Sequence, residues 1–162
     1  MNGRTAIYTG PKTIELREYP VIDPEPGAIM LRIKQAGLCG SDLHIWRGEL
    51  GEPWPGGRPI GHEGLATIHA LGKGVTTDSV GLPLREGDRV TWFPIFSCQR
   101  CELCLAGDQH ICSKRKVAFK MRGDEEPYFF GTFGDFFYLP PNHPVFKIPD
   151  AVADEEVVSV NC

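Results

Sequence analysis

Four cysteines lie within a stretch of fifteen residues in the middle of the chain. They are Cys98, Cys101, Cys104 and Cys112, spaced C-x2-C-x2-C-x7-C. Four thiolates this close together repel one another unless a cation lies among them, and Zn²⁺ bound by four sulfurs is the usual closed structural site. Structural zinc stabilises small folded peptides by on the order of 10 kcal/mol. The spacing therefore predicts a metal-stabilised segment that needs no hydrophobic core of its own.

Other chemistries compete with zinc in this segment. A bacterial iron–sulfur run shares the first spacings but continues with three residues and then Cys-Pro, whereas here seven residues precede Cys112 and Ser113 follows it. Zinc is favoured on that spacing, and an iron–sulfur cluster stays as the alternative. Disulfides are disfavoured in a reducing compartment. His110 could replace one thiolate, although a solvated loop histidine is the simpler interpretation.

A second group of metal-binding residue types is spread along the chain. Cys39 comes at the end of an expected strand, where side chains can point into a cleft. His62 and Glu63 lie between two glycines, in a turn flexible enough to bring both polar groups to one place. Together with a further thiolate, Cys39 and His62 would form a Cys₂His set with an open fourth position, the arrangement of a catalytic zinc site.

Each of these residues also has a simpler interpretation. A single buried cysteine is commonly a small core residue, and a single buried histidine commonly satisfies a local hydrogen bond. Ser41 could be only a helix cap, and Asp42 only an acidic residue at a helix start. The residue types alone therefore leave the second site open.

The elements that must position these groups are mostly short strands. Alternation of apolar and polar residues predicts strands at 5–9, 13–18, 28–35, 65–71, 89–93, 133–139 and 145–148. A short helix is expected over 41–47 with Ser41 as its cap, and Asp150 is expected to cap a second helix near the end. The cysteine-rich segment shows little periodicity. We therefore expect a mainly β, barrel-like domain with that segment as an irregular excursion.

Composition limits the class of protein. The chain has 162 residues, of which 41% are hydrophobic, and this suits one globular domain. Its net charge of −4 argues against a protein that binds phosphate backbones, and no run of about 18 apolar residues is present. We expect neither a nucleic acid nor a membrane as a partner. The amino terminus shows no secretory signal, so the cytoplasm is the expected location.

Four motifs in this order resemble the amino-terminal catalytic domain of zinc-dependent medium-chain alcohol dehydrogenases. They are Gly37-Leu38-Cys39-Gly40-Ser41-Asp42-Leu43-His44, Gly61-His62-Glu63-Gly64, Gly87-Asp88-Arg89-Val90 and the four-cysteine segment. The resemblance continues through Asp154-Glu155-Glu156 to Cys162, and so covers nearly the whole chain.

The resemblance implies a GroES-like β-barrel over residues 1–150. It also implies a structural-zinc lobe over about 93–120, and a start at 151–162 of a helix leading to a cofactor-binding domain. The lobe zinc would be bound by Cys98, Cys101, Cys104 and Cys112.

The resemblance also implies a catalytic zinc bound by Cys39, His62 and Cys162, with Glu63 as a nearby carboxylate. Asp42 would orient His62, because a ligating imidazole usually donates its other N–H to an acceptor. Ser41 would contact the substrate oxygen, and His44 would pass the proton to solvent.

The second half of such enzymes, a Rossmann domain, is not expected in this chain. Gly72-Lys73-Gly74 comes nearest to G-x-G-x-x-G, but Thr77 occupies the third glycine position, so no cofactor-binding residues are assigned. We expect Cys162 at a loose end, and therefore a lobe zinc that is held firmly but a catalytic zinc that this chain holds weakly or not at all.

The sequence is thus interpreted as the catalytic domain of an enzyme that oxidises a small alcohol or polyol by hydride transfer to NAD or NADP. The chain alone is expected to be inactive, and the full-length enzyme to be a homo-oligomer. The alternatives are a stand-alone structural or binding module stabilised by zinc, and an iron–sulfur electron carrier.

Overall fold

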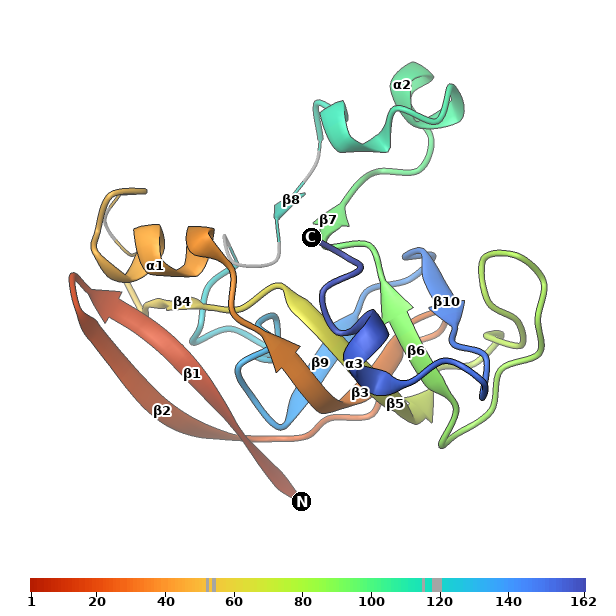
Figure 1. Ribbon diagram of the computed structural model, residues 1–162, viewed down its shortest axis with the longest axis horizontal. Helices are drawn as coiled ribbons and strands as arrows, with labels where there is room; N and C mark the ends of the chain where they lie inside the picture. The colour runs from red at the N-terminus through yellow and green to blue at the C-terminus, as the bar shows by residue number, and fades with distance from the viewer. Residues whose placement is uncertain (52, 54, 115, 118–120) are drawn as a thin grey trace.

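The computed structural model describes residues 1–162 apart from 52, 54, 115 and 118–120. Its main body consists of antiparallel strands, with one segment projecting away from them (Figure 1). The strands of the body are β1 (Asn2–Gly10), β2 (Thr13–Pro20), β3 (Ile29–Gly37), β4 (Arg58–Pro59), β5 (Glu63–Leu71), β6 (Arg89–Trp92), β9 (Phe136–Leu139) and β10 (Val145–Lys147). Each expected strand coincides with one of these, although the ends differ by a few residues.

The strands form two sheets that position the functional residues. One sheet has the order β2-β1-β4 and the other β10-β6-β5-β3-β9, and all pairs among the described residues are antiparallel. A bridge between Thr5 and Gly134 connects the first sheet to the segment before β9. The mainly β class is therefore confirmed, and the described residues contain none of the parallel pairing on which a Rossmann domain is built.

The core lies against the larger sheet. The alternation over 28–35 implies a strand with one buried face, but Ile29, Met30 and Leu31 at the start of β3 are all buried, because all three apolar side chains belong to the core. Trp92 of β6 packs on Phe137 of β9, with ring centroids 4.7 Å apart. This apolar packing fixes the strand ends from which the candidate ligands project.

Both predicted helix caps are wrong. Helix α1 (Gly40–Trp46) has Cys39 rather than Ser41 at its N-cap, and α3 (Asp154–Val157) has Ala153 rather than Asp150. In each helix a carboxylate three residues later accepts the N-cap backbone N–H: Asp42 at 3.0 Å in α1 and Glu156 at 2.9 Å in α3. The reciprocal half of a capping box thus replaces the expected side-chain cap.

The projecting segment, called the lobe from here on, comprises residues 95–117. It begins with β7 (Ile95–Phe96), ends with β8 (Lys116–Val117), and holds α2 (Glu102–Leu105) and the 3₁₀ helix η1 (Gln109–Ile111). In Figure 1 the part of the lobe that holds α2 projects away from both sheets, whereas Phe96 of β7 packs on Phe137 of β9 with ring centroids 6.4 Å apart. Residues 115 and 118–120 of the predicted lobe lie outside the described residues, and its boundaries stay a prediction.

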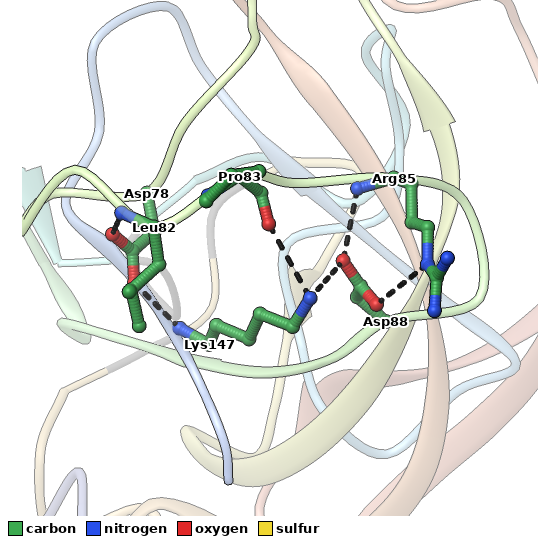
Figure 2. A network of polar contacts seen from close by, with 6 residues as sticks. All are labelled: Asp78, Leu82, Pro83, Arg85, Asp88 and Lys147. Carbon is green, nitrogen blue, oxygen red and sulfur yellow. Dashed lines mark hydrogen bonds and ion pairs between the residues drawn. The ribbon is translucent and has the colours of Figure 1, made fainter.

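Polar contacts attach the loop before β6 to β10 (Figure 2). Asp88 accepts hydrogen bonds from the Nζ of Lys147 at 2.8 Å and from the backbone N–H of Arg85 at 2.9 Å. The backbone N–H of Lys147 donates to Asp78 at 3.0 Å. Burial alone would raise the pKa of Asp88, but Lys147 and the Arg85 N–H outweigh it and the pKa is lowered. The carboxylate therefore stays charged and holds the start of β6 in place.

His143 is expected to make the fold sensitive to acid. It is buried, its Nε2 lies 2.5 Å from the carbonyl oxygen of Phe93, and burial lowers its pKa to about 4. An unfolded histidine titrates near 6.5, so between these two values the unfolded chain binds a proton that the folded chain excludes. Stability should therefore fall as the pH drops through this window, by up to about 3 kcal/mol.

The measurement is urea unfolding between pH 7 and pH 4 on the wild-type chain and on His143→Phe. The phenylalanine cannot titrate, so the variant should lose less stability over this range, and other acid-sensitive groups cancel in the comparison. Equal losses in the two chains would show that His143 is not the sensitive group.

Candidate metal centres

The structure gathers the four lobe cysteines into one cluster. Cys98 follows β7, Cys101 is the N-cap of α2, Cys104 lies in α2, and Cys112 is the C-cap of η1. Their sulfur atoms lie 3.4 to 3.9 Å apart in the contacts that link the four. A tetrahedral ion with Zn–S bonds of about 2.3 Å places its ligands about 3.8 Å apart. The donor set and its spacing therefore fit zinc.

Backbone dipoles also prepare this cluster for a cation. The backbone N–H groups of Arg100 and Cys101 point at the sulfur of Cys98 and lower its pKa to about 6. A thiolate is the form that binds metal. His110 is exposed and lies outside the group of ligand atoms, which agrees with its interpretation as a solvated loop histidine.

A second cluster forms from residues that are far apart in sequence. Cys39 lies between β3 and α1, His62 and Glu63 lie at the start of β5, and Cys162 is the last residue. One ligand atom of each lies within 4.8 Å of those of the others. The Sγ atoms of Cys39 and Cys162 are 3.5 Å apart, and the Sγ of Cys162 is 3.9 Å from the Nε2 of His62.

The two ring nitrogens of His62 face different groups. Nε2 faces the sulfur of Cys162 and lies 3.4 Å from the Oγ of Ser41. Nδ1 lies 3.4 Å from the Oδ1 of Asp42. Asp42 is the main cause of a raised pKa at His62, against the opposing effect of burial. Both side chains are more than nine-tenths buried. Asp42 thus lies where an acceptor could orient a ligating imidazole.

The charges of the second cluster fit a cation. Glu63 is the main cause of the raised pKa of Cys162, which reaches about 12, and Cys39 contributes to it. Ser41, through its side chain and its backbone N–H, lowers the pKa of Cys39. Acidic groups that disfavour one another's charged forms are relieved by a shared divalent ion. Two sulfurs, one imidazole and a carboxylate are ligands that zinc accepts.

The proposed proton acceptor lies outside this cluster. His44 of α1 is half exposed, and its Nδ1 is paired with the Oε2 of Glu49. It follows Ser41 by three residues on the helix, a spacing that places both on one face. Glu49 could not be identified from the sequence, because a single carboxylate in a loop carries no spacing signal.

The expectation that Cys162 lies at a loose end is not supported by the geometry. The adjacent Asn161 is buried, and its amide group pairs with the backbone of Gly64. Asn161 could not be identified from the sequence either, since nothing in its sequence context distinguishes it from a surface polar residue. None of the described helices has the length and apolar character that crossing a bilayer requires.

Known proteins provide an independent comparison. The chain is 36% identical over 160 residues to 5-exo-hydroxycamphor dehydrogenase of Pseudomonas putida, covering 98% of this chain and 43% of the relative. It is 31% identical to a probable D-xylulose reductase A of Aspergillus fumigatus, covering 93% and 39% of the two chains. The chain thus spans about two-fifths of the length of these relatives.

Solved structures agree. An alcohol dehydrogenase from Thermotoga maritima superposes with a TM-score of 0.88 at 25% identity, covering 100% of this chain and 45% of the other. An Escherichia coli alcohol dehydrogenase in complex with NADH superposes with a TM-score of 0.73 at 30% identity, covering 97% and 41%. The family model described as the alcohol dehydrogenase GroES-like domain matches residues 25–150. By sequence and by fold, this chain belongs to the alcohol dehydrogenase GroES-like domain family.

Proposed function

We propose that the chain is the substrate- and zinc-binding part of a zinc-dependent alcohol dehydrogenase. The enzyme would oxidise a small-molecule alcohol or polyol to a carbonyl and transfer the hydride to NAD or NADP. The observation that supports this most directly is the convergence of Cys39, His62, Glu63 and Cys162 in addition to the four-cysteine cluster. A closed metal site can serve to stabilise a purely structural module. A second site that is partly open to solvent has no evident role in such a module.

The metal ligands are assigned from the two clusters. Cys39, His62 and Cys162 would hold the catalytic zinc, with Glu63 as the neighbouring carboxylate, and the four lobe cysteines would hold the structural zinc. When bound, the catalytic zinc supplies a Lewis acid that lowers the pKa of a substrate hydroxyl group.

The remaining polar residues would handle the proton. Ser41, with its hydroxyl 3.4 Å from the ring of His62, is placed to contact the substrate oxygen. His44 would take the proton on toward solvent, since histidine is the residue that most often shuttles protons. Its pairing with Glu49 engages Nδ1 and leaves Nε2 to exchange the proton. Asp42 would keep His62 in one orientation and one tautomer.

The hydride acceptor requires residues beyond those described here. The described strands pair antiparallel, and no glycine-rich turn between a strand and a helix has been found in the sequence. We therefore infer that a cofactor-binding domain completes the enzyme and that the 162-residue chain alone is inactive. A homo-oligomeric state and a cytoplasmic, reducing location belong to the same proposal. Neither the structural module nor the iron–sulfur carrier is favoured by the family relationships.

Zinc analysis of the 162-residue chain tests the proposal. The wild-type chain should hold two zinc ions and Cys39→Ser one, because a serine hydroxyl replaces a thiolate poorly as a zinc ligand. Ser159→Ala, an exposed change in the segment before Cys162, should retain both. A wild-type chain that holds zinc only at the lobe would contradict the proposed function.

A further inference from the structure

The residue next to Cys162 is buried although its neighbours are exposed. Asn161 is 9% exposed, whereas Val160 is 60% exposed and Cys162 is also exposed. The Oδ1 of Asn161 accepts the backbone N–H of Gly64 at 3.2 Å, and its Nδ2 donates to the carbonyl oxygen of Gly64 at 3.5 Å. The amide group thus exchanges two hydrogen bonds with one residue, as paired residues of antiparallel strands do.

Gly64 is a rigid anchor for this contact. It pairs with Ala36 in the β3–β5 ladder, three residues before Cys39. A Cβ added at Gly64 would lie 3.0 Å from Thr132 and 3.3 Å from Trp92, so the backbone here is closely packed. Gly64 also follows directly after His62 and Glu63, two members of the second cluster. The anchor therefore belongs to the same piece of sheet that fixes the other ligands.

The position of Asn161 decides where the sulfur of Cys162 lies. An earlier contact of this segment joins Asp154 to Lys34 and Arg89, at 2.5 Å each, and lies seven residues before Asn161. The backbone N–H groups of Val160 and Cys162 donate to Val157 and Ser159, and these contacts are local turns. The contact with Gly64 is one residue from the thiol, which lies 3.5 Å from the sulfur of Cys39.

We propose that Asn161 is a positioning residue for the second metal centre. Its paired hydrogen bonds to Gly64 hold the backbone before Cys162 against β5, so that the third ligand is already in place before the ion binds. This inference rests on the proposed function, because it gives Asn161 a role only if Cys39, His62 and Cys162 bind a metal. Preorganisation of this kind raises affinity by removing the cost of ordering a ligand.

The test compares Asn161→Ala and Asn161→Leu with the wild-type chain. Leucine keeps most of the buried volume but forms no hydrogen bond, so it separates packing from the amide contact. Zinc affinity is measured by competition with a chromogenic chelator, and the lobe serves as an internal reference within each chain. Both variants should bind the second zinc about 10- to 100-fold more weakly, the range found when partners of metal ligands are removed. Lobe affinity should not change, and Ser159→Ala should match the wild type.

A second readout follows the hydrogen bond itself. Amide hydrogen exchange at Gly64 should accelerate in both variants, because its N–H loses the Oδ1 acceptor. Faster exchange at Gly64 with an unchanged zinc affinity of the second site would overturn the inference while leaving the metal site intact. Unchanged exchange at Gly64 would also overturn it. A wild-type chain that binds no second zinc would remove the proposed function, and the inference with it.

Discussion

Replacing Cys104 with serine is expected to release one zinc ion and unfold the lobe while the sheets stay folded. Two of the residues buried in the lobe, Cys104 and Cys112, are themselves candidate ligands, and its Leu105 is 77% exposed. Apart from Phe96, which packs with the core of the body, apolar burial therefore contributes little there, and the metal must supply the folding energy. Loss of that ion removes on the order of 10 kcal/mol from the lobe. The body keeps its own core around Trp92.

Limited proteolysis together with zinc analysis measures this effect. The Cys104→Ser chain should be cut rapidly within 95–117 and should retain one zinc, and the near-UV signal of the core should persist. The matched control is Cys39→Ser, the same chemical change in the other cluster, which should lose the other zinc and keep the lobe resistant to the protease. Collapse of the whole chain in the Cys104 variant would show that lobe and body fold as one unit.

The fold could be predicted where burial follows a simple period. The alternation at 89–93 located β6, whose residues alternate between half-buried and buried. The strand expected at 65–71 coincides with β5, although Leu65 and Ala66 are both buried there. Two-residue β4 has no period to detect, and 133–135 is not a strand, since Gly134 only bridges to Thr5. The helix caps failed for a different reason. Ser41 and Asp150 were selected by residue type. In both helices, however, a carboxylate three residues after the N-cap accepts the backbone N–H of the N-cap residue.

The candidate sites divide in the same way. The close spacing of its four cysteines predicts the lobe cluster. The second cluster, whose members are up to 123 residues apart, is predicted only by the resemblance to a family. Neither residue spacing nor the family resemblance identified Glu49 and Asn161. Each contributes through one contact that depends on how the chain folds back, His44 in the first case and Gly64 in the second. A single residue without periodicity or spacing leaves no signal of such a contact.

Replacing Asp42 with asparagine is expected to weaken the second metal centre about 10- to 100-fold. One carboxylate oxygen accepts the backbone N–H of Cys39 at 3.0 Å, and the other lies 3.4 Å from the Nδ1 of His62. Asparagine retains an oxygen for Cys39 but turns an NH₂ group toward an N–H, so the ring loses its acceptor. Asp42→Ala should bind zinc at least as weakly, and should also lose about 1 kcal/mol of stability with the helix-end contact.

Chelator competition and urea unfolding separate the two roles of Asp42. The asparagine variant should lose affinity with little change in stability, whereas the alanine variant should lose both. Asp135→Asn is the matched control for zinc affinity, because Asp135 pairs with Arg4 and belongs to neither group of candidate ligands. If asparagine preserved zinc affinity and alanine abolished it, Asp42 would act only by fixing the start of α1. Other contacts of the His62 ring would then have to set its orientation.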